Sequence, residues 1–292
     1  MKRHLCGAVV AIMLLGISPA CAEELWVPHL RGIDEGLVAG ALPPKGLYFI
    51  NNTYFASWKL YDGNGKPTGT KLDALVDIPI LLWNPGIKVL GADYALGIAQ
   101  PFDYSSMDNT SGSAHTGTYN TVLIPAMLSW ALPNNFHIKT GLSVYVDDAS
   151  SASGTRAPSA GVGSGNGFWT LEPELGISWL KDGWNLSADI RYDYNFKNET
   201  TDYNSGNMLS VEYTVAKTFG KWTVGAGAAH QHQIQHDRGP SAGGTRFSYT
   251  AGPLVEYNFG SVSLTATLNF DITTHHDFGG DFLNVRLVVP LD

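Results

Sequence analysis

The sequence predicts an all-β protein: a transmembrane antiparallel up-and-down β-barrel of about 12 strands, preceded by a signal peptide. Three observations predict this fold. An export signal opens the chain, apolar and polar residues alternate in segment after segment, and short connections alternate with long ones. Outer-membrane barrels alternate lipid-facing and lumen-facing side chains along each strand, and they alternate short periplasmic turns with long external loops.

Residues 1–22 have the three parts of a signal peptide. A basic start precedes an apolar stretch over 5–17, and a small-x-small cleavage signal follows at 20–22. This stretch is too short to span a membrane as a helix. Ser18 stands where a lipidation motif needs an apolar residue, which argues against a lipid anchor. We therefore expect export, with the mature chain starting at Glu23.

The composition fits a barrel better than a soluble domain. Both cysteines, Cys6 and Cys21, lie in the signal, so the mature chain has no disulfide and no thiolate site. Charged residues make up 15% of the chain, below the roughly 25% of soluble domains. Acidic residues number 26 against 18 basic ones, which argues against nucleic acid as a partner.

Residues 23–45 precede the first predicted strand and form a region of their own. They contain apolar residues, among them Trp26, Leu30 and Ile33. Two alternatives stay open from the sequence. The segment is either a periplasmic tail or a plug that enters the lumen of the barrel.

Alternating apolar and polar residues define twelve strands within 46–292, the region assigned to the barrel. Pro79, Pro125, Pro173 and Pro253 fall inside them. Because proline lacks the N–H that a strand ladder needs, each marks either a bulge or a strand whose predicted boundary is misplaced. The predicted strands are 46–61, 70–82, 87–102, 117–132, 136–146, 168–180, 184–195, 207–219, 222–235, 245–259, 262–274 and 281–290.

The clearest strand is 184–195, in which every second residue is apolar or aromatic and every other residue is polar. Its length suits the roughly 9–11 residues that a tilted strand needs to cross a bilayer. Successive side chains of a strand point to opposite faces. We therefore expect its apolar face to meet lipid, and Asp189, Arg191 and Asp193 to point into the lumen.

The connections support the same topology. An even number of strands places both ends of the barrel on the periplasmic side, where short turns belong. The Ser/Gly/Ala-rich segment 147–167 cannot build a core; it is either an exposed loop or a loop that folds inward and narrows the pore. The short connections are 83–86, 133–135, 181–183, 220–221 and 260–261, and the long ones are 62–69, 103–116, 147–167, 196–206, 236–244 and 275–280.

Several motifs resemble one known family. The run 41–49 leads into an aromatic first strand, an Asp-Gly-Asn-Gly turn follows at 62–65, and the stretch 83–94 and the strand start 176–179 complete the pattern. Together they resemble an outer-membrane family linked by name to the meta-pathway of phenol degradation. The resemblance covers most of the mature chain and is best between about 40 and 102. It implies a secreted barrel associated with aromatic-compound catabolism, and it supplies no catalytic or binding residues.

Charged residues on the polar strand faces are the candidates for a functional site. Buried charges must be paired, and charged side chains that line a pore set its selectivity. The spacing of Glu172 and Glu174 also allows a carboxylate pair for acid/base chemistry, but a structural or selectivity role is the favoured interpretation. The lumen and selectivity candidates are Glu172, Glu174, Asp189, Arg191, Asp193, Glu212 and Arg286.

Histidines near one predicted strand end are weak metal candidates. His230 and His232 share a strand face, and His236 follows closely, so two imidazoles could meet one ion. No spacing fixes a third ligand, and polar residues at the membrane rim are the favoured interpretation. We therefore expect no metal and no cofactor.

The sequence favours a channel in the bacterial outer membrane that lets small molecules, aromatic or hydrophobic ones included, enter passively. Its expected surroundings are outer-membrane lipid and lipopolysaccharide, with a small solute as partner and no nucleic acid. Two alternatives stay open. A lipase-like barrel enzyme would need a serine and a histidine within hydrogen-bond reach, and no local signature marks such a pair. A barrel filled by side chains would be structural, without transport.

Overall fold

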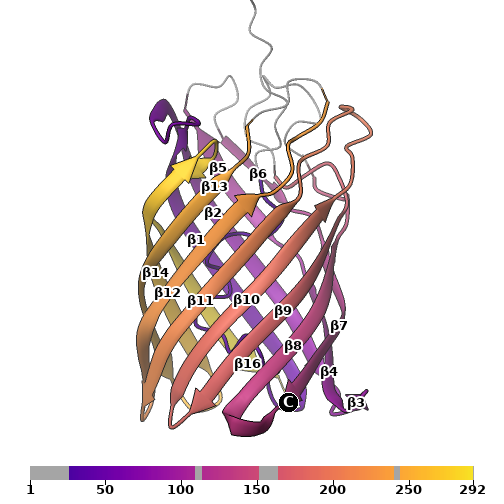
Figure 1. Ribbon diagram of the computed structural model, residues 1–292, viewed down its shortest axis with the longest axis vertical. Coiled ribbons are helices and arrows are strands. Elements are labelled where there is room, and N and C mark those ends of the chain that lie inside the picture. Colours follow the sequence, from indigo (N-terminus) through magenta and orange to yellow (C-terminus); the bar gives the residue numbers. More distant parts are fainter. Residues whose placement is uncertain (1–25, 109–113, 151–163, 240–243, 292) are drawn as a thin grey trace, which may run out of the picture.

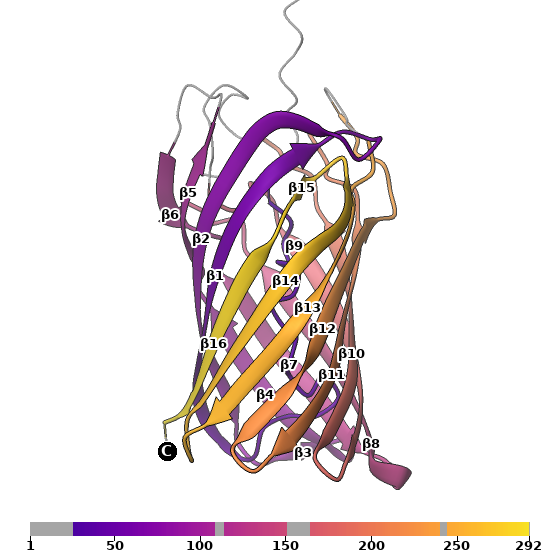
Figure 2. The ribbon, with the colours of Figure 1, turned by 90° about the vertical axis from the view of Figure 1, so that its left-hand side faces the viewer.

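The computed structural model describes residues 26–108, 114–150, 164–239 and 244–291. The predicted signal peptide lies outside these ranges. All strand segments belong to one sheet, and β1 pairs with both β2 and β16, so the sheet closes on itself. Figures 1 and 2 show the resulting tall barrel with tilted strands. Within the described residues, no helix is long and apolar enough to cross a membrane.

The sixteen strand segments form twelve barrel strands, as the sequence predicts. β4 and β5 are two pieces of one strand, as are β6 and β7, and β15 continues β16, while β3 belongs to a turn. The segments are β1 Gly46–Tyr61, β2 Pro67–Asn84, β3 Lys88–Val89, β4 Ala92–Ala99, β5 Phe102–Met107, β6 Ala114–Thr118, β7 Val122–Ala131, β8 Phe136–Tyr145, β9 Thr170–Lys181, β10 Trp184–Asn195, β11 Met208–Phe219, β12 Trp222–Gln233, β13 Phe247–Asn258, β14 Ser263–His275, β15 Phe278–Gly279 and β16 Phe282–Pro290, with a short 3₁₀ helix at Pro133–Asn135.

The predicted bounds of one strand, and of the loop that follows it, are wrong. The sequence predicts a strand over 87–102 and a long loop over 103–116. In the structure this strand begins at Ala92 and ends at Met107. The apolar residues after position 86 belong to a small hairpin of β3 and β4. Positive φ angles turn the chain there, 77° at Gly86, 52° at Leu90 and 81° at Gly91, and apolar alternation alone does not reveal them.

The other predicted strands match the observed barrel strands to within three residues. Pro125 lies in a bulge, where the pairing of β7 with β8 shifts register between Leu123 and Ala126. The ladders show no register shift at Pro79, Pro173 or Pro253, so these three prolines do not mark a bulge.

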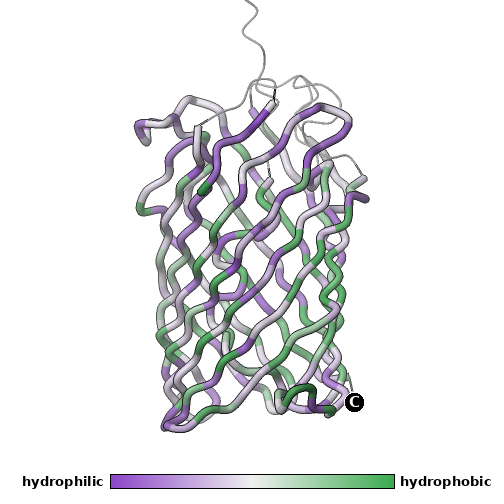
Figure 3. Tube along the Cα trace, turned by 45° about the vertical axis from the view of Figure 1, so that its right-hand side comes forward, coloured by the Kyte–Doolittle hydropathy of each residue, from purple (hydrophilic) through white to green (hydrophobic). Residues whose placement is uncertain are grey.

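Strand β10 has the predicted orientation. Trp184, Leu186 and Tyr194 are exposed on the outer face, whereas Asp189 and Asp193 are buried inside the barrel. Figure 3 shows hydrophobic and hydrophilic residues alternating along the strands. The outer face of this strand is therefore apolar, as contact with lipid requires.

Strand β2 departs from this pattern, because its inner face is apolar. Leu72, Val76 and Ile78 share a face that is buried inside the barrel. The outer face is mixed: Leu81 and Trp83 are exposed on it beside Asp77, whose carboxylate accepts a hydrogen bond of 2.7 Å from Asn51. The inward apolar row packs in one core cluster with residues of the N-terminal segment (Trp26, Leu30 and Ile33).

The N-terminal residues 26–45, called the lumenal segment below, run inside the barrel. Figures 1 and 2 show this stretch as an indigo trace between the walls, leading to the start of β1 at the end where the C-terminus lies. Short turns gather at that end and longer connections at the opposite end. By the topology of outer-membrane barrels, the short-turn end is periplasmic.

Candidate functional site

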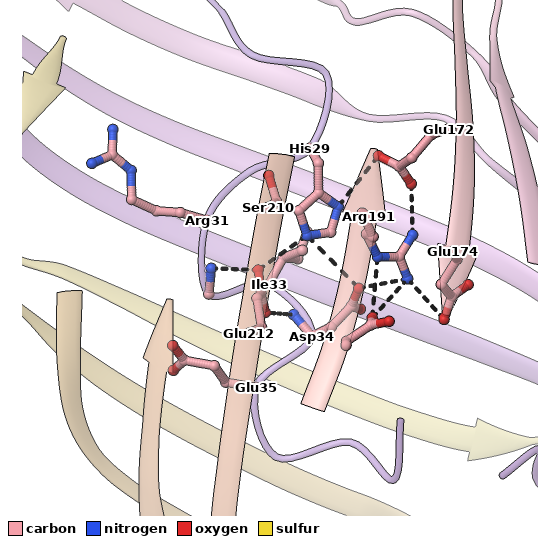
Figure 4. Close-up of polar contacts among 12 residues, drawn as sticks. His29, Arg31, Ile33, Asp34, Glu35, Glu172, Glu174, Arg191, Ser210 and Glu212 are labelled. Atoms are coloured by element: carbon pink, nitrogen blue, oxygen red, sulfur yellow. Dashed lines mark hydrogen bonds and ion pairs between the residues drawn. The ribbon is translucent and has the colours of Figure 1, made fainter. Parts of the chain in front are cut away.

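Arg191 on β10 is the centre of a buried charge network inside the barrel (Figure 4). Its guanidinium lies 2.6 Å from Glu172 and 3.3 Å from Glu174 on β9, and 3.1 Å from Asp189 on its own strand. It also lies 2.9 Å from Asp34 of the lumenal segment. The planar, permanently charged guanidinium suits such multiple carboxylate contacts, so this one residue joins the wall to the segment.

His29 is the second link between segment and wall. Its Nε2 atom lies 3.0 Å from the Glu212 carboxylate on β11, and its Nδ1 atom lies 3.7 Å from Glu172. The His29 carbonyl also accepts a 2.7 Å hydrogen bond from Gln231. Its side chain is buried, so a charged imidazolium here depends on these carboxylates.

Glu212 also binds the backbone of the lumenal segment. One carboxylate oxygen accepts a hydrogen bond of 2.7 Å from the Gly32 N–H, and the other accepts one of 2.9 Å from the Asp34 N–H. A carboxylate that accepts several N–H bonds is a strong anchor. Glu212 therefore fixes both the position and the direction of the segment.

A further anchor forms around Glu35. Arg286 on β16 donates hydrogen bonds of 3.0 Å to the Ile33 carbonyl and 2.5 Å to the Glu35 carbonyl. Asn269 donates one of 2.7 Å to the Glu35 carboxylate. On β12, a Cβ atom added at Gly227 would overlap this carboxylate, so only glycine leaves room for it.

Both ends of the lumenal segment are held as well. Near its start, Arg31 donates a 3.0 Å hydrogen bond to Asp277 and lies over the Trp58 ring at 4.9 Å from the centroid. Near its end, the Gly40 N–H donates a 2.7 Å bond to Ser178, and its carbonyl accepts one of 2.9 Å from Ser129. The segment is thus bound along most of its length.

The surroundings shift the pKa values of the segment's own ionisable groups. Burial lowers the pKa of His29, but the hydrogen bond to Glu212 and the nearby carboxylates outweigh it and raise this pKa to about 10. Burial raises the pKa of Asp34, but Arg191 and His29 outweigh it and lower this pKa to about 2. Burial and the nearby Glu212 raise the pKa of Glu35 to about 9. At neutral pH the segment therefore carries a charged His29, a charged Asp34 and a protonated Glu35.

The structure brings most of the lumen candidates into this one network. Glu172, Glu174, Asp189 and Glu212 all surround Arg191 or His29, and Lys139 on β8 lies 2.5 Å from Glu174. Arg286 is buried in the separate anchor around Glu35. Asp193 is also buried, and its carboxyl group lies beside that of Glu172.

Reasoning from the sequence missed the segment's half of the network. His29, Arg31, Asp34 and Glu35 were not among the candidates, because no strand pattern covers them. One feature of the sequence could have indicated that the segment lies inside the barrel. These four charged or titratable residues are interleaved with Leu30 and Ile33, which is unusual for a solvated tail.

The histidine candidates lie apart from the network. The ring centroids of His230 and His232 lie 6.2 Å apart. Both rings contact Phe247 on β13, with centroid distances of 5.2 Å from His230 and 5.6 Å from His232. His236 is exposed beyond the end of β12. In the described parts of the chain, no group of three or more His, Cys, Asp or Glu side chains could hold a metal ion.

The predicted loop 147–167 lies partly outside the described residues, which omit 151–163. Its final stretch is buried at the barrel: Ser164 contacts Asp103, and the Asn166 N–H donates a 2.7 Å bond to the Asn120 side chain. At the start of the loop, the Asp148 carboxylate accepts a 2.8 Å bond from the Thr121 N–H. The two described ends of the loop are therefore tied to the break between β6 and β7.

A cavity of about 120 Å³ lies between the lumenal segment and the wall. Ile33, Val76, Ile78, Val122 and Ile124 form an apolar side, while His29, Asp34 and Arg191 place the charge network at its border. The site as a whole can therefore hold the segment in the lumen and leave a small, mostly apolar space beside it.

Solved structures of other proteins resemble this fold. An outer membrane channel from Pseudomonas putida superposes with a TM-score of 0.75 at 13% identity, covering 86% of this chain and 97% of that chain. The translocator domain of the autotransporter NalP from Neisseria meningitidis gives 0.50 at 10% identity, covering 86% and 91%. These likenesses support the barrel fold alone. No curated protein matches the chain significantly.

A family profile described as "Putative MetA-pathway of phenol degradation" matches residues 59–287. The match spans most of the barrel, from the end of β1 into β16. It agrees with the resemblance of the motifs around the first strands. The chain therefore belongs to this family of β-barrel proteins.

Proposed function

We propose that this protein is an outer-membrane channel for small, largely apolar molecules, and that its lumenal segment closes the channel. The observation that carries the proposal is the way the segment is held. Polar and ionic contacts to β7, β9–β12, β14 and β16 bind a stretch that is not itself part of the wall. A purely structural filling could be apolar, whereas a set of ion pairs can break and re-form.

Exposed aromatic residues on the outside of the barrel support its insertion in the outer membrane. Trp222 and Phe259 are exposed on the outside near the short-turn end, and barrels carry such aromatic girdles at the membrane interfaces. Outer-membrane lipid and lipopolysaccharide are thus the expected neighbours, with a small solute as the transported partner.

The enzyme alternative finds no support in the site. A serine hydrolase needs its histidine hydrogen-bonded to a serine, whereas His29 bonds Glu212 and His275 contacts Thr273 and the Gly63 carbonyl. Among the described residues, no histidine hydrogen bond reaches a serine hydroxyl. The carboxylates Glu172 and Glu174 are occupied by Arg191 and Lys139.

Planar-bilayer recording of the purified full-length barrel tests the proposal. We expect discrete conductance steps in simple salts, because transient release of the segment opens the lumen. A folded barrel that stays silent in every recording contradicts a channel. A lipase assay on the same preparation then tests the enzyme alternative directly.

A further inference from the structure

We infer that the small hairpin formed by β3 and the start of β4 is a lipid anchor, which inserts its tip into the periplasmic leaflet of the outer membrane. This hairpin spans residues 85–92 and is called the rim hairpin below. Figure 1 shows it projecting from the wall at the end of the barrel where the C-terminus lies. Its apolar tip, the faces on which its side chains lie and the hydrogen bonds of its backbone all support a lipid surface as its partner.

The tip of the rim hairpin is apolar and exposed. Leu90 is 85% exposed, and Ile87 and Val89 are exposed beside it. Leu90 also has a positive φ of 52°, a conformation that is less favourable for leucine than for glycine or asparagine. Exposing so much apolar surface to water is unfavourable as well, whereas lipid around the Leu90 side chain would remove that second cost.

The rim hairpin continues the alternation of the barrel wall. Ser129 on β7 points into the lumen, where its hydroxyl donates a 2.9 Å bond to the Gly40 carbonyl. Asp93 stands opposite Ser129, and Lys88 stands opposite Asp93, so these side chains share the inner side of the sheet. The two charges pair there at 2.7 Å. Val89, the next residue, therefore lies on the outer side, toward lipid.

This outer side is continuous with the lipid-facing surface of the barrel. Trp83, just before the hairpin on β2, is exposed on the outer face. Trp130 follows the inward-pointing Ser129 on β7, so it also points outward. Because tryptophan is enriched where membranes meet water, these two residues place the hairpin at the edge of the periplasmic leaflet. Its apolar side faces lipid, which favours a membrane over a soluble periplasmic protein as the partner.

The backbone of the turn is paired in the way that a lipid environment requires. The Trp130 indole N–H donates a 3.2 Å bond to the Leu90 carbonyl, and the Tyr94 N–H donates one of 3.2 Å to the Ile87 carbonyl. Carbonyl groups without a partner are costly in lipid, where water cannot pair with them. The Trp130 bond also draws the tip toward the outer face of β7.

The base of the rim hairpin is tied to the lumenal segment. The Asn84 side chain accepts a 2.9 Å bond from the Gly86 N–H and donates one of 2.8 Å to the Pro43 carbonyl. A Cβ atom added at Gly86 would lie 2.6 Å from the Lys45 side chain, so the end of the segment packs against the turn. An anchored hairpin therefore holds the end of the lumenal segment at the membrane surface.

A fluorescent probe on the tip tests the inference. Both cysteines lie in the predicted signal peptide, so a single introduced cysteine can be labelled in the mature chain and the protein refolded into vesicles of phosphatidylethanolamine and phosphatidylglycerol. Leu90→Cys is compared with Asp182→Cys. Asp182 is a matched control, because it is exposed in another short turn at the same end and has the same φ of 52°. Its carbonyl likewise accepts a side-chain bond, from Lys217.

We expect the emission of an environment-sensitive probe at the Leu90 position to shift to shorter wavelength. Lipids that carry a nitroxide on the acyl chain should quench most of this emission. The probe at the polar Asp182 turn should emit as it does in water and lose little intensity. Val89→Cys, on the same outer side, should behave like Leu90→Cys and replaces it if that variant does not fold.

The outcomes are independent of the proposed function. Strong quenching at the Leu90 position with weak quenching at Asp182 supports the anchor, whether or not the same preparation conducts ions. Weak quenching at both positions in folded protein overturns it, because the tip then lies in water, open to a soluble partner. Equally strong quenching at both positions also overturns it, because any short turn would then reach the leaflet.

Discussion

Replacing Arg191 by methionine should destabilise the folded barrel strongly. The Arg191 side chain is 12% exposed and lies within 3.3 Å of four carboxylates. Methionine keeps much of the volume but leaves these carboxylates with Lys139 and His29 as their nearest cations. Removing one partner of a buried ion pair costs about 3–5 kcal/mol, and we expect a loss of this size in the free energy of unfolding.

Denaturant titration of the folded barrel in detergent micelles measures this loss. Lys88→Met is the matched control: Lys88 pairs with Asp93 at a similar distance, 2.7 Å, but its side chain is 63% exposed. Exposed pairs contribute about 0–1 kcal/mol, so the control should change little. Arg191→Lys should fall between the two, because an ammonium cannot reproduce the contacts of the guanidinium fork. Losses below about 1 kcal/mol for both methionine variants would show that Arg191 does not stabilise the barrel through these buried ion pairs.

Three further perturbations test the charge of His29, the anchor around Glu35 and the outer face of β10. His29 keeps its proton in the folded state up to a pKa of about 10, above its ordinary pKa of 6.5, so its stabilisation is complete below about pH 6.5 and is lost as the pH rises through about 10. Unfolding measured from pH 6 to 10 should therefore show a decline in stability that His29→Gln largely removes; an equal decline in both proteins would contradict this. Gly227→Val should displace the Glu35 carboxylate and make the lumenal segment more susceptible to added protease. Val224→Ala, on the exposed outer face of the same strand, should not change cleavage. Equal cleavage of both variants would contradict the role of Glu35 in holding the segment. Leu186→Arg places a charge on the exposed apolar face of β10 and should cost about 2–4 kcal/mol in lipid vesicles if that face lies near the bilayer midplane; an unchanged free energy of unfolding would argue that this face does not meet lipid there.

The barrel itself could be predicted from the sequence because alternation is a local property. In 184–195 every second residue reports which face it occupies, and the short-long rhythm of connections orders the strands. Strand β2 shows the limit of this argument. Alternation defines the strand itself, but the inward direction of its apolar row depends on Trp26, Leu30 and Ile33, which pack against it from a distant part of the chain.

The site was only half predictable for the same physical reason. Glu172, Asp189 and Arg191 stand on polar strand faces, so their inward position follows from strand geometry. His29 and Asp34 lie in a segment without periodicity, and only the closed barrel brings them within 3.0 Å of Glu212 and 2.9 Å of Arg191. The cavity depends on strand breaks at Pro101 and Tyr119, which alternation does not mark.

Planar-bilayer recording of the wild-type chain beside Arg191→Met tests whether the ion-paired lumenal segment closes a channel. We expect brief, infrequent conductance steps for the wild type and longer or more frequent openings for the variant, since the variant loses the contact between Arg191 and Asp34. Identical recordings from the two proteins, both shown to be folded, would contradict it.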